Sequence, residues 1–222
     1  MKRILVIAAH PDDEALGVAG TLVRHAVSGD MINILFLADG EGSRGTKNNL
    51  SKRQNAAHLA GKIMGASSVK LHNFPDNKMD SVPQLDVIKV IEEVILELQP
   101  NIIYTHHGGD LNIDHQVTHR ALMTALRPMP SSTIENIYGF EVLSSTEWGS
   151  LGQDAPFRPS HYVDITETFD RKLSALKCYD DEMRLFPNAR SYEAVAALAS
   201  LRGSQVGLMK AEAFSCLRSI WR

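Results

Sequence analysis

The sequence predicts an α/β fold in which helices cover both faces of a mostly parallel central sheet and the C-terminal part is helical. Short apolar runs typical of strands alternate with longer helical patterns through the first half of the chain. A polar loop follows each of the first four runs. With 222 residues, 44% of them hydrophobic, the chain can bury a substantial core, and we expect one domain over residues 1–222.

The expected strands are short and apolar. The first run, from Ile4 to Ala9, is partly β-branched and is bounded by Pro11, as in a strand buried on both faces. We expect strands at 3–9, 31–38, 69–74, 101–107 and 134–142, with another short one at 162–165.

The helices between these strands are predicted from apolar periodicity. We expect them near 15–28, 49–65, 83–98 and 114–127. The third shows the period best, because Ile88, Ile91 and Ile95 recur at three- and four-residue steps while Glu92 lies on the other side. Pro100 ends that pattern.

Composition and charge exclude several functional classes. A formal charge of -3 without a Lys/Arg cluster argues against a nucleic-acid partner. Cys178 and Cys216 form no CxxC pair and indicate neither a disulfide framework nor a thiolate zinc site. No segment is long enough for a membrane span, and the short N-terminal apolar run lacks a cleavage site, so we expect a cytoplasmic protein.

The loops after the strands carry the polar residues that could form a site. In an open parallel sheet, ligands bind beyond the carboxyl ends of the strands. The four loops are His10–Glu14, Asp39–Gly45, Pro75–Asn77 and His106–His115. They should therefore meet at one edge of the sheet.

His10, Asp13 and His115 have the chemistry of a hydrolytic zinc site, which uses about three His, Asp or Glu ligands and leaves one position open for water. Asp12 is then free to act as a general base. The competing interpretation is that Asp12 and Asp13 only cap the helix that begins at Glu14. Capping alone does not explain His10 or the second histidine-rich loop, so we favour the metal site.

The remaining loops lack nucleotide-binding motifs but suit a hydroxyl-rich ligand. The glycine-rich loop 39–45 lacks the terminal Lys-Ser/Thr of a phosphate-binding loop. Glu41 and Asp76 could accept hydrogen bonds from hydroxyl groups, and Arg53 could donate them. His106 and His107 end the fourth strand and could line the same site.

Several of these segments together resemble the PIG-L (LmbE-like) family of metal-dependent N-deacetylases. The matching segments are His10–Glu14, Gly40–Gly42, Phe74–Asp76, Asp114–His115 and Ala211–Phe214. The resemblance implies a Rossmann-like three-layer fold with additional C-terminal elements and a catalytic zinc ion. It also implies hydrolysis of the N-acetyl group of an N-acetylglucosamine-type sugar conjugate.

Carried over by position, the resemblance makes His10, Asp13 and His115 the metal ligands and Asp12 the general base. The same comparison places Glu41, Arg53 and Asp76 at the sugar. The sequence departs from many members at one position, where Asn112 replaces a histidine that helps to polarise the amide carbonyl. Either Asn112 donates to the oxyanion, or His106 or His107 does so, and we expect His107 at the substrate. We expect Asp114 to orient a site imidazole.

Two other functions are compatible with these residues. A non-haem Fe(II) oxygenase would use His10, Asp12 and His115 as its two-histidine, one-carboxylate triad and would leave Asp13 free. A non-catalytic sugar-binding protein could keep the fold without the chemistry. We favour the deacetylase with one Zn²⁺ per chain, Fe²⁺ being the alternative metal, and an amino-sugar conjugate as substrate. Members of the resembled family often form a homo-oligomer, but this sequence specifies no interface and leaves the oligomeric state open.

Overall fold

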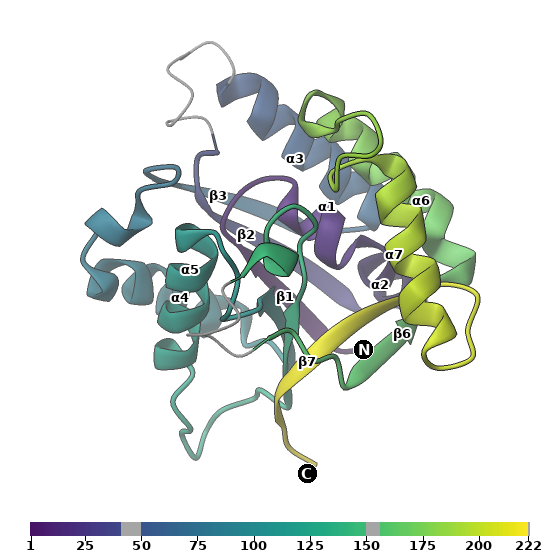
Figure 1. The fold of residues 1–222 in the computed structure, drawn as a ribbon. Helices are drawn as coiled ribbons and strands as arrows, with labels where there is room; N and C mark the ends of the chain where they lie inside the picture. Colours follow the sequence, from purple (N-terminus) through teal and green to yellow (C-terminus); the bar gives the residue numbers. More distant parts are fainter. Residues whose placement is uncertain (41–49, 150–155, 222) are drawn as a thin grey trace.

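The computed structural model describes residues 1–40, 50–149 and 156–221, which form one seven-stranded sheet between two layers of helices (Figure 1). The strand order is β3-β2-β1-β4-β5-β7-β6. The first five strands in this order are parallel, whereas β7 is antiparallel to both of its neighbours. The mostly parallel sheet predicted from the sequence is therefore confirmed.

The described elements follow the predicted alternation of strand and helix. The strands are β1 (Arg3–Ala8), β2 (Met31–Ala38), β3 (Ser68–Phe74), β4 (Ile102–His106), β5 (Asn136–Phe140), β6 (His161–Asp164) and β7 (Ala211–Ser219). The helices are α1 (Asp13–Gly17), α2 (Ala19–Val27), α3 (Leu50–Met64), α4 (Gln84–Leu98), α5 (Ile113–Ala125), α6 (Phe169–Leu176) and α7 (Tyr192–Ser204). Short 3-10 helices are η3 (Met79–Ser81), η4 (Thr146–Trp148), η5 (Thr166–Thr168) and η6 (Lys177–Glu182). Within the described ranges, no helix combines the length and the apolar character that crossing a bilayer requires.

The helix expected near 15–28 is divided into α1 and α2. The break lies at Val18, which has φ of -143°. Because α2 starts afresh there, its first backbone N–H groups have no partner within the helix. Glu212 of β7 accepts hydrogen bonds from two of them, Gly20 N at 3.0 Å and Thr21 N at 2.7 Å.

The C-terminal part is helical in η5, α6, η6 and α7, but after α7 the described chain forms strand β7. This strand lies between β5 and β6 and is antiparallel to both. Its first four residues, Ala211–Phe214, are all buried. Alanine and glutamate favour helices, so local preference points away from a strand there, and pairing on both sides overrides it.

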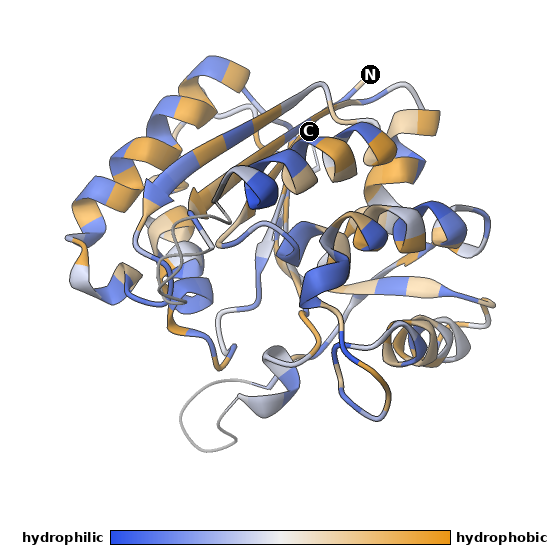
Figure 2. Ribbon diagram, turned by 90° about the horizontal axis from the view of Figure 1, so that it is seen from above, coloured by the Kyte–Doolittle hydropathy of each residue, from blue (hydrophilic) through white to orange (hydrophobic). Residues whose placement is uncertain are grey.

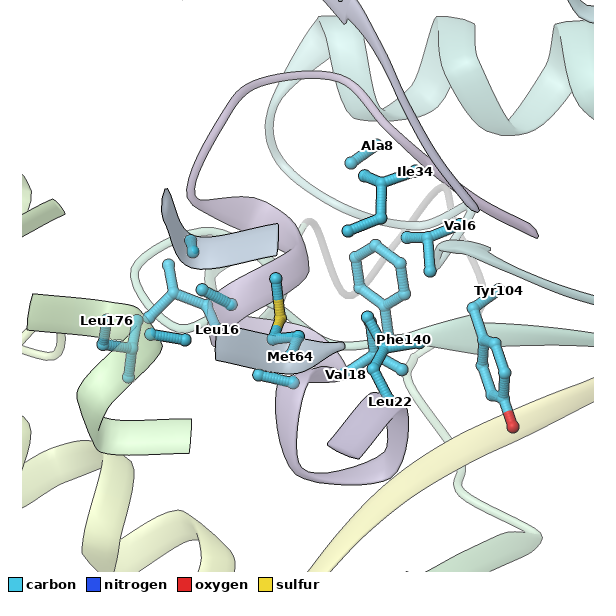
Figure 3. Packing of buried hydrophobic residues seen from close by; sticks show 14 of the residues in the cluster. Val6, Ala8, Leu16, Val18, Leu22, Ile34, Met64, Tyr104, Phe140 and Leu176 are labelled. Carbon is cyan, nitrogen blue, oxygen red and sulfur yellow. The ribbon is translucent and has the colours of Figure 1, made fainter. Parts of the chain in front are cut away.

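The side chains of β1 alternate between the two faces of the sheet. Val6 and Ala8 point into the larger core, which α1, α2, α3, α6 and α7 cover, and Figure 3 shows them beside Leu22 and Phe140. Leu5 points to the opposite face of the sheet, into the smaller core that α4 and α5 cover. Burying such a side chain stabilises the fold by about 1.5–3 kcal/mol. In Figure 2 the central strands are mainly hydrophobic and the outer helices are mixed.

The connections change sides between β1 and β4, which are hydrogen-bonded neighbours in the sheet. From β1 the chain passes through α1 and α2 to β2, and it reaches β4 through α4 on the opposite face (Figure 1). Such a switch point opens a crevice at the carboxyl ends of the strands. The loops that follow β1 and β4 meet at this place.

Candidate metal centre

His10, Asp13 and His115 lie together at the carboxyl ends of β1 and β4. One potential ligand atom from each lies within 4.8 Å of the others, and all three residues are buried. Asp13 Oδ2 is 3.3 Å from His10 Nδ1 and 3.2 Å from His115 Nε2. Two imidazole nitrogens and one carboxylate oxygen are the donor types of a catalytic zinc site with an open position.

Two local backbone structures bring these ligands together. After β1 the chain makes a tight turn in which His10 N donates to Asp13 Oδ2 at 2.9 Å and Asp13 N donates to His10 O at 3.3 Å. Asp13 then begins α1. His115 lies in the first turn of α5, which follows the loop after β4. Asp13, three residues after His10, and the distant His115 therefore meet because β1 and β4 are adjacent in the sheet.

Each histidine of this group contacts a carboxylate through its other ring nitrogen. Asp114 Oδ2 lies 2.9 Å from His10 Nε2, and Asp110 Oδ1 lies 3.1 Å from His115 Nδ1. Such carboxylates fix the ring orientation and the tautomer of metal-binding histidines. The arrangement leaves His10 Nδ1 and His115 Nε2 directed at Asp13.

Asp110 has no assigned role in the sequence-based prediction, although it lies in the second histidine-rich loop. It is buried and accepts hydrogen bonds from Thr146 Oγ1 at 2.5 Å and from the hydroxyl of Ser145. Burial raises its pKa, but the contacts with His115, Ser145 and Thr146 outweigh this and lower the pKa to about 2. The only sequence signal for Asp110 is a carboxylate in this loop, five residues before His115.

The electrostatics of the site favour a cation. Burial lowers the pKa of His115, but the charge of Asp13 and the hydrogen bond with Asp110 raise it to about 9. Burial likewise lowers the pKa of His10, and its hydrogen bonds with Asp114, Asp13 and Asp76 raise it well above the ordinary value. Carboxylates that hold a proton on an imidazole also attract a metal ion in its place. The donor set and its charge therefore fit a divalent metal.

Asp12 lies beside the three ligands but is not among them. Its backbone has φ of 123°, which costs a residue other than glycine about 1–3 kcal/mol. Its Oδ2 contacts Arg190 Nη1 at 2.8 Å and Arg53 Nη2 at 3.2 Å. Burial raises the pKa of Asp12, and the two guanidinium groups offset only part of that increase. Asp12 is thus a buried, oriented carboxylate next to the candidate metal position.

Glu14, expected to start the helix, lies in the first turn of α1 and also supports the turn before it. Its side chain is fully buried, with Oε2 accepting from Asp12 N at 3.0 Å and Oε1 accepting from the Tyr179 hydroxyl at 2.7 Å. Burial raises the pKa of Glu14 to about 8. The hydrogen bond from Asp12 N to Glu14 holds the strained backbone of Asp12. Tyr179, the other partner of Glu14, is too distant in sequence to be predicted.

Asn112 acts as the N-cap of α5. Its Oδ1 accepts a hydrogen bond from Asp114 N at 2.8 Å, and its Nδ2 donates to Asn77 Oδ1 at 3.2 Å. Asparagine is a preferred residue at this position. The cap fixes the plane of the amide, so Nδ2 is the group that could reach a ligand.

His106 is an internal part of the site. Its ring is fully buried, stacks on His115 with centroids 3.8 Å apart and accepts a hydrogen bond from Ala9 N at 2.8 Å. Burial lowers its pKa well below the ordinary value and keeps the ring neutral. It supports the His115 ring and has no exposed surface for a substrate.

The predicted substrate-binding residues are distributed around this centre. Arg53 is buried and forms ion pairs with Asp12 and Glu182, and Asp76 Oδ1 lies 3.2 Å from His10 Nε2. His107 is buried at the end of β4. Glu41 lies outside the described residues. The roles of all four at a sugar remain predictions.

Comparisons with known proteins agree with this geometry. The model of the family "PIG-L: GlcNAc-PI de-N-acetylase" matches residues 5–126. The uncharacterized deacetylase YaiS of Escherichia coli is 32% identical over 182 residues, which cover 79% of this chain and 89% of that protein. A probable N-acetyl-α-D-glucosaminyl L-malate deacetylase 2 of Bacillus cereus is 27% identical, with 79% of this chain and 81% of that protein covered.

A solved structure shares the whole fold. The 4-carboxy-2-hydroxymuconate hydratase GalB of Pseudomonas putida superposes with a TM-score of 0.80 at 21% identity and covers 100% of this chain and 98% of its own. The fold therefore extends beyond the segment that the family model matches. On the match over residues 5–126 and the similarity to YaiS, the chain belongs to the PIG-L (GlcNAc-PI de-N-acetylase) family.

Proposed function

We propose that the protein is a metal-dependent N-deacetylase that hydrolyses the acetamide of an N-acetylglucosamine-type sugar conjugate to a free amine and acetate. One observation carries the proposal: His10, Asp13 and His115 converge, with the buried carboxylate of Asp12 beside them. Three ligands with an adjacent general base are the minimum that metal-assisted amide hydrolysis requires. The deacetylase relatives from E. coli and B. cereus support the same reaction.

The alternatives predicted from sequence receive less support. An iron oxygenase triad would include Asp12, whereas neither candidate group among the described residues, His10–Asp13–His115 or His10–Asp76–Asp114, contains it. Those oxygenases are usually antiparallel jelly rolls, unlike this mostly parallel sheet. A purely sugar-binding role would leave no use for a buried carboxylate beside a complete ligand set.

His10 Nδ1, Asp13 Oδ2 and His115 Nε2 would hold the metal, which we propose is Zn²⁺. A zinc ion bound there would lower the pKa of a water molecule and polarise the acetamide carbonyl. Asp114 and Asp110 keep the two imidazoles in the tautomers that expose these nitrogens.

Asp12 would act as the general base. Its carboxylate accepts a proton from the water molecule as that water attacks the amide carbon, and it returns the proton to the leaving amine nitrogen. Burial shields this carboxylate from solvent, and the ion pairs with Arg53 and Arg190 orient it. Protonation of the amine makes it a better leaving group, so one residue serves both steps.

Asn112 would supply the oxyanion donor. Its Oδ1 is held by the helix cap, and its Nδ2 could exchange the 3.2 Å contact with Asn77 for the amide oxygen of the substrate. Arg53, Asp76 and Glu41 would surround the sugar, as the family resemblance implies, and His107 would also lie at the substrate. A neutral amide in this position does not change charge with pH.

The experiment is to measure acetate release from a panel of N-acetylglucosaminyl conjugates by the zinc-loaded protein and by its Asp12→Ala variant. We expect turnover by the wild type and a loss of about 100-fold or more in the variant, which keeps its metal because Asp12 is not a ligand. Full activity of Asp12→Ala would refute the role of Asp12. No acetate from any conjugate, with metal bound, would refute the deacetylase and direct attention to hydration, the activity named for the GalB relative.

A further inference from the structure

Arg190 reaches the general base from the far end of the chain. Its Nη1 is 2.8 Å from Asp12 Oδ2, and its Nε donates to Ser144 Oγ at 3.0 Å. The Arg190 side chain is 20% exposed and that of Asp12 is 3% exposed. The guanidinium group is therefore fixed at two points, one of them the catalytic carboxylate.

The backbone around Arg190 is held on both sides. Arg190 N donates to Asn188 Oδ1 at 2.9 Å, and Arg190 O accepts from Arg184 N at 2.8 Å. The next residue, Ser191, caps α7 by accepting from Ala194 N at 3.1 Å. A side chain presented by such a closed loop and helix start has little freedom to move.

The contacts of the Asp12 carboxylate are unequal. Within the described residues its ion pairs are with Arg190 and Arg53, and both fall on Oδ2. Arg53 is shared, because it also forms an ion pair with the buried Glu182. The contact with Arg190 is the shorter of the two, a hydrogen bond of 2.8 Å against 3.2 Å for Arg53. Arg190 is therefore the main restraint on the direction of the carboxylate.

We propose that Arg190 is the positioning residue of the general base: it holds Oδ2 of Asp12 so that Oδ1 is the oxygen that receives the proton. This inference rests on the proposed deacetylase reaction. Arg190 itself does not touch the reacting atoms. An error of about 1 Å in the placement of a catalytic group can lower the rate about 100-fold, which sets the size of the expected effect.

The test compares Arg190→Met and Arg190→Lys with a matched control, Arg202→Met. Arg202 forms a similarly buried pair with Glu141, with contacts of 2.7 and 2.6 Å, and among the described residues it contacts neither Asp12 nor the proposed metal ligands. We expect Arg190→Met to lower kcat about 100-fold while KM changes less than about 3-fold and bound zinc is unchanged. Arg190→Lys should recover part of kcat, since lysine restores the charge without the fork.

Further measurements separate positioning from general stabilisation. Added guanidinium ion should restore part of the activity of Arg190→Met, and Arg202→Met should keep kcat within about 3-fold even if it melts earlier. A crystal structure of Arg190→Met should show the Asp12 carboxylate turned away while His10, Asp13 and His115 stay in place.

Two results would overturn the inference. One is a kcat of Arg190→Met within about 3-fold of wild type, and the other is an Asp12 carboxylate that keeps its direction in the variant crystal. The crystal structure does not depend on the substrate. If the wild type releases no acetate but Asp12 turns in the variant, the deacetylase proposal fails while Arg190 still orients Asp12.

Discussion

Replacing Lys172 by methionine should destabilise the protein strongly, although Lys172 is not one of the proposed metal ligands. Lys172 Nζ donates to Glu212 Oε1 at 2.6 Å and to Leu16 O at 2.7 Å. Glu212 in turn accepts the two N–H groups at the start of α2. The side chains of both members of this ion pair are only 5% exposed.

The expected magnitude follows from what the substitution leaves behind. Methionine fills the space but leaves the Glu212 carboxylate buried with only two backbone donors. Breaking a buried ion pair from one side costs about 3–5 kcal/mol. In a protein of 222 residues this lowers Tm by roughly 6–20 °C.

The assay is urea unfolding of wild type, Lys172→Met, Glu212→Gln and the double variant, all with the metal removed so that ligand binding does not contribute. The double variant removes both charges. It should be less destabilised than the sum of the single variants, with a coupling energy of about 0.5–3 kcal/mol. Zinc binding by separate, folded samples of the variants should remain near that of the wild type.

Two outcomes would refute this reasoning. One is a free energy of unfolding of Lys172→Met within about 1 kcal/mol of wild type. The other is strict additivity in the double variant, which would mean that the two charges do not depend on each other.

Two other predictions concern packing and pH. Gly17→Ala should cost about 1–3 kcal/mol in urea unfolding, because the new Cβ would lie 2.4 Å from Phe140 Cδ2 in a closed core. Hydrogen bonds from the hydroxyl and backbone N of Thr166 lower the pKa of Asp164, so their contribution to stability is present above the unfolded pKa of 3.8 and is lost as pH falls through the lower folded value. In an NMR titration, Thr166→Val should raise the pKa of Asp164.

Each of these has its own check. For Gly17, the second-site change Phe140→Leu should relieve part of the cost, and equal stabilities of Gly17→Ala and wild type would contradict the close contact. For Asp164, an unchanged carboxyl pKa in Thr166→Val would show that the 2.6 Å hydroxyl contact does not act on the charge.

The alternation of strand and helix and the centre of the site could be predicted from the sequence because both are local signals. Strand β1 and the His10–Glu14 segment are contiguous, and α5 brings His115 directly after β4. Short apolar runs in strict alternation with helices leave few other topologies. The convergence of His10, Asp13 and His115 could therefore be anticipated from strand ends alone.

The parts that were missed depend on tertiary contacts between distant residues. Strand β7 is defined by pairing with β5 and β6 rather than by its own composition. Arg190 and Tyr179 look like ordinary residues of a loop and a helix until the fold places them beside Asp12 and Glu14. A single sequence carries no signal for such pairs.

The contact between Arg190 and Asp12 also determines how late in synthesis the Asp12 carboxylate can be oriented. Asp12 and Arg190 are separated by 178 positions. A ribosome that adds about 5–20 residues per second needs roughly 9–36 s to make that interval. During this time the nascent chain carries His10 and Asp13, two of the proposed metal ligands, without the arginine proposed to orient Asp12. The His10–Asp13 segment is thus synthesised well before the Asp12 carboxylate can acquire its contact with Arg190.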